Sequence, residues 1–257
     1  MPETLLLLIK QREMEFKGAD YALAWEALGR MDASDLDLIR EHEIFKAFAT
    51  KTGKLREFEG TPGTFFSLED CATILLSVSK FHATHEDDHL HAVEGGIVGE
   101  PIIINIIAGM PISWVCQLGP FHAISACAYA VTLLKFETPQ FFDKIPMNSA
   151  NMRMLARDGT AQEIGNCCYA YYTANVNARK FFSEINSQGE RLARDGDPQD
   201  VANISSCLKK FKVKAPLFFA AVEMKVQEGL DEGVGVQILE AALPMAHQRR
   251  VIAGRDF

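Results

Sequence analysis

The sequence lacks the short motifs that many enzyme classes require. It has no glycine-rich phosphate-binding loop and no Gly-x-Ser-x-Gly nucleophile motif. Its six cysteines include no Cys-x-x-Cys pair. We therefore expect a protein that is not an enzyme, with no catalytic residues, no metal site and no cofactor. The cysteines are expected to be buried free thiols in a reducing compartment.

One long stretch has no charged side chain. Pro101–Leu134 contains no Lys, Arg, Asp or Glu across 34 residues. Prolines and glycines divide it, and no uninterrupted run reaches the roughly 20 apolar residues that cross a bilayer. We expect two helices instead of a membrane span, at about 102–109 and 121–136, buried between repeats or against a partner protein. The first 17 residues mix three acidic and three basic side chains, unlike a transit or signal peptide.

Charge is unevenly distributed along the chain. Residues 1–140 carry 11 Lys and Arg against 20 Asp and Glu, a balance of −9, whereas residues 141–225 carry 12 against 9, a balance of +3. The whole chain has a formal net charge of −8. A protein of this kind is not a general polyanion binder, so we expect no DNA binding and confine any RNA contact to the basic segment.

Part of the chain repeats itself at a fixed interval of 37 residues. The matching pairs are Leu-Ala-Arg-Asp-Gly at 155–159 and 192–196, Gln-Glu-Ile-Gly-Asn at 162–166 with Gln-Asp-Val-Ala-Asn at 199–203, and Phe-Phe at 181–182 and 218–219. A period of 20–50 residues is typical of stacked helical repeats. The sequence therefore predicts an all-α fold, an α-solenoid of stacked helical hairpins whose N-terminal half is degenerate.

Apolar spacing and capping residues predict the individual helices. Ser67 with Asp70, and Asp197, are the predicted N-caps, and small residues such as Gly165 are expected to allow close approach of the two helices of one unit. The predicted helices are 3–16, 20–31, 34–50, 67–81, 162–172, 178–194, 198–210, 215–228 and 236–243. The predicted regions are 1–140 (degenerate repeats), 141–230 (regular repeats) and 231–257 (cap and tail).

The run Asp-Pro-Gln-Asp-Val-Ala-Asn-Ile-Ser at 197–205 resembles the octotricopeptide and heptatricopeptide helical repeats and the related repeats of FASTK-type and RAP-domain proteins. Ser206 and Tyr169 stand where the family pattern often has Trp, and no RAP domain follows. The resemblance covers 141–225 best. It implies an α-solenoid in a mitochondrion or chloroplast that works on organellar RNA, in some cases as a ribosomal subunit.

Seven basic residues of this segment are the predicted RNA contacts. They are Arg157, Arg191, Arg194, Lys209, Lys210, Lys212 and Lys214. Stacked repeats place equivalent residues in a row, so Arg157 and Arg194 are expected to form a ladder that meets phosphates, as the four lysines would. The sequence leaves open the alternative that the lysines only complement a helix dipole and face water.

Two other groups of side chains have alternative interpretations. Asn166 and Asn203 occupy equivalent positions and could read bases, although a hydrogen bond between repeats is the favoured interpretation. His85, Glu86 and His89 form a His-Glu-x-x-His pentad that could hold zinc on a helix. No third ligand is evident, and we favour a solvated polar loop over a zinc hydrolase.

With the basic segment, the resemblance implies a non-catalytic, RNA-associated protein of the mitochondrion, with the chloroplast as the alternative. The most concrete expectation is a subunit of the mitochondrial ribosome or of its assembly, in contact with rRNA and neighbouring proteins. The alternative is a structural scaffold in another organellar complex, such as a respiratory one, without RNA contact. In either case Pro101–Leu134 is a candidate surface for the protein partners.

Overall fold

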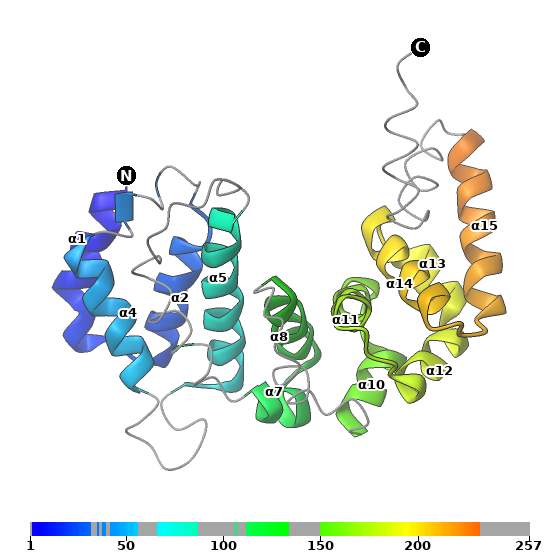
Figure 1. The fold of residues 1–257 in the computed structure, drawn as a ribbon, viewed down its shortest axis with the longest axis horizontal. Helices are drawn as coiled ribbons and strands as arrows, with labels where there is room; N and C mark the ends of the chain where they lie inside the picture. The colour runs from blue at the N-terminus through cyan, green and yellow to red at the C-terminus, as the bar shows by residue number, and fades with distance from the viewer. Residues whose placement is uncertain are drawn as a thin grey trace. The chain divides into compact units, whose positions relative to one another are not determined.

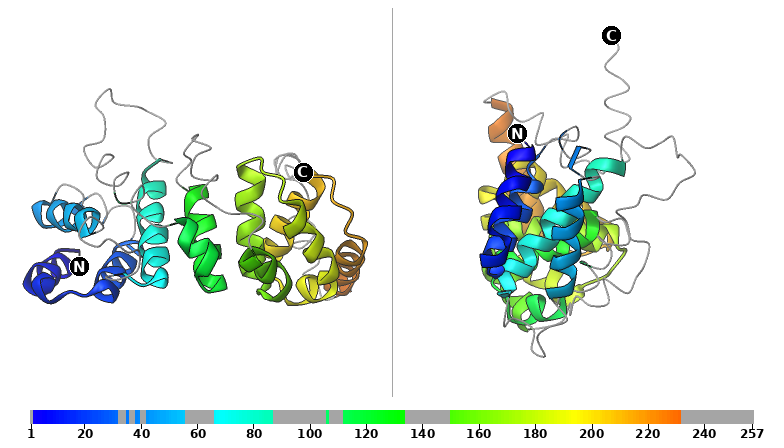
Figure 2. Two further views of the ribbon diagram at one scale, coloured as in Figure 1. Left: turned by 90° about the horizontal axis from the view of Figure 1, so that it is seen from below. Right: turned by 90° about the vertical axis from the view of Figure 1, so that its left-hand side faces the viewer.

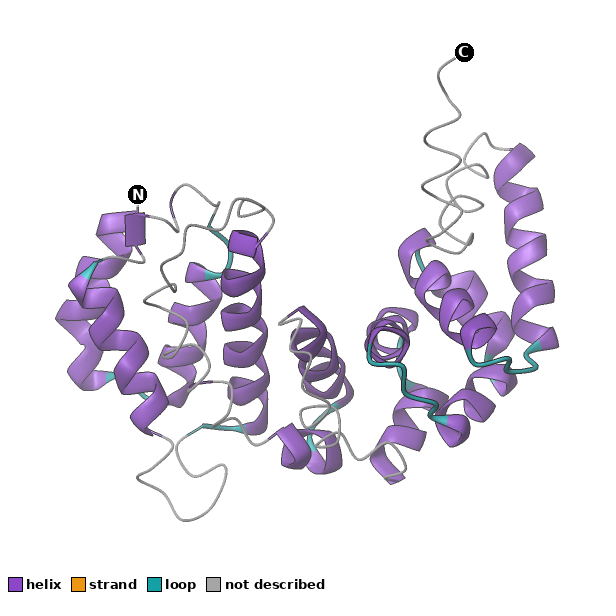
Figure 3. Cartoon of the chain, viewed as in Figure 1, coloured by secondary structure: helices purple, strands orange, loops and turns teal. Residues whose placement is uncertain are grey.

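The computed structural model is all-helical, as predicted, and its described residues contain no strand (Figure 3). The described residues are 2–31, 35, 38–39, 42–55, 66–86, 106, 112–133 and 150–231. The chain divides into two compact units, Met1–Glu137 and Thr138–Phe257, and each is described by itself. The predicted helix 236–243 and most of the predicted helix 102–109 lie outside the described residues.

The first unit packs its helices around α5 (Figure 1). Its elements are α1 (Pro2–Arg12), the 3₁₀ turn η1 (Glu13–Glu15), α2 (Gly18–Leu28), α4 (Glu43–Leu55), α5 (Leu68–Glu86), α7 (Ile112–Leu118) and α8 (Phe121–Leu133). The long helix α5 contacts α2, α7 and α8, while α1 packs against α4. The predicted N-cap of α5 is confirmed, because the Asp70 N–H donates to Ser67 Oγ (3.0 Å) and the Ser67 N–H to Asp70 Oδ2 (2.9 Å).

Aromatic side chains fill the core of this unit. Tyr21 of α2 stacks on Phe48 of α4 at a ring-centroid distance of 5.4 Å. Trp25 is fully buried and donates its indole N–H to Thr52 Oγ1 at 3.2 Å. The uncharged stretch contributes to the same core, since Ile124 of α8 is also fully buried. No helix among the described residues combines the length and the apolar character needed to cross a bilayer.

In the second unit each helix packs mainly on a helix that does not directly follow it in sequence. Its helices are α10 (Ala150–Asp158), α11 (Ala161–Thr173), α12 (Arg179–Ser187), α13 (Gly189–Asp195), α14 (Pro198–Lys210) and α15 (Pro216–Asp231). Helix α10 packs on α12, α11 on α14, and α13 on α15. Figures 1 and 2 show α15 at one end of this unit, next to α13.

Helices α11 and α14, which are equivalent in the 37-residue sequence repeat, begin with the same capping arrangement. Thr160 Oγ1 accepts from the Glu163 N–H (3.2 Å), and Glu163 Oε2 accepts in return from the Thr160 N–H (2.8 Å). At α14 the predicted cap is confirmed, because Asp197 Oδ1 accepts from the Asp200 N–H at 2.8 Å. These bonds satisfy N–H groups that the helix itself leaves open.

Several predicted boundaries were wrong, and the largest error has a packing cause. The predicted helix 178–194 is two helices, α12 and α13, with the break at Gln188. A Cβ on Gly189 would stand only 2.4 Å from the backbone nitrogen of Phe218, so α13 can cross α15 this closely only with glycine there. Helices α4, α5 and α15 end later than predicted, at Leu55, Glu86 and Asp231, and α7 was not predicted.

The small residue Gly165 does allow a close approach, but not the predicted one. Its Cβ position lies 3.2 Å from Cα of Asp200, so the contact joins α11 to α14, the second helices of successive hairpins. The sequence suggested contact within one hairpin, because spacing cannot tell which neighbour a helix face meets. The buried thiols were predicted correctly: all six cysteines are free and buried. Burial raises the pKa of Cys71 to about 12, which leaves that thiol unreactive.

Candidate nucleic-acid interface

The candidate interface lies where α11 and α14 end. Asn175 and Lys212, the first residues past the caps of α11 and α14, have positive φ values of 57° and 54°. The Val176 N–H donates to the Tyr171 carbonyl, and the Val213 N–H donates to the Leu208 carbonyl, both at 2.9 Å. Both helices therefore end in the same Schellman turn, with the left-handed residue 37 positions apart.

The predicted arginine ladder is electrically neutralised. Arg157 and Arg194 are exposed, and each guanidinium forms an ion pair with the aspartate that follows it, with shortest distances of 2.7 Å to Asp158 and 2.8 Å to Asp195. The hydrogen bonds from these guanidiniums hold the pKa of both carboxyl groups below their ordinary value. Each step of the ladder therefore presents a paired charge rather than a free cation.

Arg191 connects two helices of the second unit. Its guanidinium donates from Nη2 to the Arg157 carbonyl (3.1 Å) and from Nη1 to the Gly159 carbonyl (2.9 Å), at the C-terminal end of α10. Lys225 of α15 makes the equivalent contacts one repeat later, donating to the carbonyls of Arg194 (3.1 Å) and Gly196 (2.5 Å). A cation here satisfies open carbonyl groups and the negative end of the helix dipole.

Lys210 has a similar structural role, and Lys209 lies beside an aromatic ring. The ammonium of Lys210 donates to the carbonyl of Tyr172 at the end of α11 (2.5 Å) and lies 4.5 Å from the centre of that residue's ring. The ammonium of Lys209 lies 5.7 Å from the ring centre of Phe219. Four of the predicted contacts (Arg157, Arg191, Arg194 and Lys210) thus already bind oxygens of this chain.

The two remaining predicted residues, Lys212 and Lys214, line a groove of about 530 Å³ in the second unit. Within the described part of the chain neither lysine has an acidic partner. The groove is lined by Asn177, Arg179, Ser183, Asn186, Phe211, Lys212, Val213 and Lys214, so it gathers three cations and no acidic side chain among the described residues. It lies between α12 and the turn after α14, and it suits an anion.

The N-terminus of α12 adds further positive charge to this end of the groove. Ala178 precedes the helix and offers no side-chain cap, and the first turn contains no acidic residue. Instead it begins with Arg179 and Lys180. Cations at a helix N-terminus oppose the helix dipole, so this local choice costs stability unless an anion is bound nearby.

Only two of the eight residues that line this groove, Lys212 and Lys214, were predicted from the sequence. The six that were not predicted are Asn177, Arg179, Ser183, Asn186, Phe211 and Val213. One signal was available: Asn-Val-Asn at 175–177 and Lys-Val-Lys at 212–214 are equivalent in the repeat. The two turns share their backbone conformation. Lysines therefore occupy positions 212 and 214, whose equivalents one repeat earlier, 175 and 177, are asparagines. Which side chains of α12 join them depends on packing that no spacing rule describes.

The other predicted groups do not form a site among the described residues. Asn203 Oδ1 accepts from Gln199 Nε2 of the same helix (3.0 Å), rather than from a residue of the neighbouring repeat. His85 and Glu86 belong to the last turn of α5, not to the predicted loop, and His89 lies outside the described residues. No group of three or more His, Cys, Asp or Glu is placed to hold a metal ion in the residues that were described.

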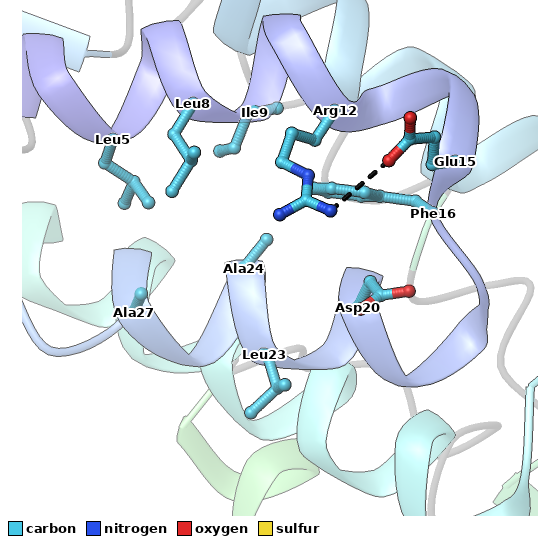
Figure 4. A pocket seen from close by; sticks show the side chains of 10 residues that line it. All are labelled: Leu5, Leu8, Ile9, Arg12, Glu15, Phe16, Asp20, Leu23, Ala24 and Ala27. Atoms are coloured by element: carbon cyan, nitrogen blue, oxygen red, sulfur yellow. Dashed lines mark hydrogen bonds and ion pairs between the residues drawn. The ribbon is translucent and has the colours of Figure 1, made fainter.

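A second groove, of about 370 Å³, lies between α1 and α2 in the first unit and is mainly apolar (Figure 4). Leu5 and Leu8 of α1 point toward Ala24 of α2, and an Arg12–Glu15 ion pair of 3.3 Å closes one end. Leu8 is 51% exposed, and Leu23 on α2 is 62% exposed. Such a surface suits a protein partner better than a polyanion.

The comparisons with known proteins found no match: no family model, no curated protein and no solved structure is similar to this chain.

Proposed function

We propose that this chain is a non-catalytic, RNA-associated protein built as an α-solenoid of roughly 37-residue helical hairpins. It works in an organelle, the mitochondrion before the chloroplast, as a subunit of the ribosome or of its assembly. There it contacts rRNA through the basic turn after α14 and neighbouring proteins through other surfaces.

The solenoid architecture is supported by the packing of helices that are one repeat apart. Helix α11 packs on α14, and α10 packs on α12, with the C-terminal end of α10 capped by Arg191. The equivalent end of α13 is capped by Lys225 of α15. In a stacked repeat array each unit contacts only its neighbours, so the same contact can recur from unit to unit. The caps formed by Arg191 and Lys225 are such a recurring contact.

The RNA contact is supported by one observation above all: the acid-free groove with Arg179, Lys212 and Lys214. Phosphates along a strand can be met by the lysines as point charges and by the arginine as a forked donor. The protein is acidic overall, so electrostatic attraction of RNA must be local to such a surface.

The test compares the protein with the double variant Lys212→Asn/Lys214→Asn, whose replacements are the residues found at 175 and 177. Ultraviolet crosslinking to RNA at low salt should succeed for the parent protein and weaken in the variant. Each phosphate contact on a single strand contributes about 0.7 to the slope of log K against log salt, so the slope should fall by about 1.4. The control is Lys10→Asn/Lys54→Asn, which removes the same charge from the first unit. Absence of any crosslinked RNA at low salt would contradict the proposal.

A second candidate function is a scaffold in another organellar complex without RNA contact. It is favoured by the apolar groove between α1 and α2 and by its exposed leucines. Replacing Leu8 and Leu23 with Ser should then remove co-purifying protein subunits and leave the fold intact. Recovery of rRNA and ribosomal proteins with the parent protein supports the first function, whereas recovery of other subunits without RNA supports the second.

A further inference from the structure

We infer that the groove between α12 and the turn after α14 holds one nucleotide of single-stranded RNA. The base lies on the ring of Phe211, and the adjoining phosphates lie on Arg179, Lys212 and Lys214. This inference rests on the proposed RNA association and specifies what one site of the protein recognises.

The dimensions of the groove suit a ligand of this size. Its volume of about 530 Å³ falls within the range of roughly 300–1,000 Å³ that is typical of small-molecule sites. A base stacked inside a duplex cannot reach a ring on the groove wall, whereas an unstacked base of a single strand or loop can. The occupant is therefore a single strand.

Phe211 provides a fixed aromatic surface. Its ring is half-buried and stacks on Phe182 at a centroid distance of 5.5 Å and an interplanar angle of 18°. Phe182 is itself fully buried in the core, so it holds the Phe211 ring in place. The Lys210 ammonium also lies 5.6 Å from the centre of this ring, so a base that stacks there must share or displace that contact. A ring that is already oriented loses little conformational entropy when a base stacks on it.

Neutral polar groups complete the groove. Asn177 and Asn186 carry amides, and Ser183 carries a hydroxyl group. The Ser183 hydroxyl donates to the carbonyl of Lys180 at 2.9 Å, which leaves its oxygen lone pairs as acceptors. Amides and hydroxyls of this kind recognise sugar hydroxyls and base edges, which a site for bare phosphate does not need.

Two features of this groove are unfavourable for the stability of the local backbone. Lys212 adopts a left-handed conformation that favours glycine, and α12 begins with cations at an uncapped N-terminus. The equivalent left-handed position one repeat earlier is Asn175, a residue that tolerates this conformation. Such departures from local preference are expected at functional sites, and a bound phosphate accounts for both of them.

The experiment measures fluorescence anisotropy with two probes of the same length, a single-stranded RNA of about ten nucleotides and an abasic strand. The parent protein should bind the RNA about 5- to 150-fold more tightly than the abasic strand, since one stacked base contributes about 1–3 kcal/mol. Phe211→Leu should remove this difference. Phe219→Leu, which changes a half-buried ring outside the groove, should preserve it. Lys212→Asn/Lys214→Asn should weaken binding of both probes.

The possible outcomes separate the inference from the proposed function. If neither probe binds at low salt, the proposed RNA association itself fails. If both bind the parent protein equally tightly, RNA association stands and the stacked nucleotide is overturned. This comparison on the parent protein needs no variant, so it decides the question even if Phe211→Leu fails to fold.

Discussion

Lys212 and Asn175 adopt the same left-handed backbone conformation 37 residues apart, with φ values of 54° and 57°. Both residues follow the cap of a helix that ends in a Schellman turn. Asparagine tolerates this conformation, whereas lysine does so at a cost. Position 212 in the turn after α14 is therefore a lysine, although a residue that tolerates the left-handed conformation would make the protein more stable.

Replacing that lysine should raise stability. Lys212→Gly removes the backbone strain, so the free energy of unfolding should increase by up to about 1 kcal/mol, while RNA binding weakens. Chemical denaturation measures the first effect and anisotropy the second. The control Lys214→Gln removes the same charge from a residue without positive φ and should leave stability within about 0.5 kcal/mol. A less stable Lys212→Gly variant would show that strain at this turn is not significant.

The cap that Arg191 places on α10 should be measurable. Arg191→Met keeps most of the aliphatic stem but removes the donors to the carbonyls of Arg157 and Gly159. The free energy of unfolding should fall by about 1–2 kcal/mol, because those carbonyls lose a charged partner. The matched change Arg194→Met removes an exposed, solvent-screened ion pair with Asp195 and should cost clearly less than Arg191→Met. Equal costs in urea denaturation would argue against the capping role.

Gly189 should tolerate no side chain. The Cβ of Gly189→Ala would meet the Phe218 backbone nitrogen at 2.4 Å, so α13 and α15 must separate, and we expect a loss of about 1–3 kcal/mol. Gly53→Ala provides the contrast. The nearest atom to a Cβ there is 3.7 Å away in Ile106, and alanine in a helix interior should stabilise by about 0.5–1 kcal/mol. Thermal melting of both variants should show shifts of opposite sign.

The carboxyl group of Asp200 should make stability depend on pH. Burial first, and the charge of Asp197 second, raise its pKa above the ordinary value of 3.8. The folded state then binds this proton more tightly than the unfolded state, so the contribution of Asp200 to stability falls as pH rises through the window between 3.8 and the raised value.

Asp200→Asn removes this titration and keeps an oxygen that can accept the Asp197 N–H, as Asp200 Oδ2 does at 3.3 Å. The variant should be more stable than the parent at pH 7, and the difference should shrink as pH falls toward 3.8. Urea denaturation at several pH values measures the difference in free energy of unfolding between the variant and the parent. The ion pairs of Asp158 and Asp195 are present in both proteins, so their pH dependence cancels in this difference. A difference that grows toward low pH would contradict the assigned direction.

The secondary structure was largely predictable because its signals are local. Asp197 before Pro198, and Ser67 three residues before Asp70, mark helix starts through bonds that span three residues. The break at Gln188 was not predictable in this way. It accompanies the tight crossing of α13 over α15, in which Gly189 meets Phe218, a residue 29 positions away.

The candidate site was predictable only in part. Lys212 and Lys214 stood out as basic residues in a basic segment, and both line the groove. Arg179 was missed, because nothing in its own neighbourhood shows that it faces a turn 33 residues later. Arg191 and Lys210 were selected for their charge, although their charged groups are occupied by carbonyl oxygens of earlier helices.

Side-chain periodicity and bonds between near neighbours were enough to predict that the chain is helical, where many helices begin, and that some segments recur after 37 residues. Which cations remain available to a ligand depends instead on contacts between residues far apart in the chain. The carbonyl groups that bind Arg191 and Lys210 lie 34 and 38 residues earlier in the chain, and only helix packing brings each donor to its acceptor. Lys212 and Lys214 are left facing the groove because no acidic side chain among the described residues reaches them.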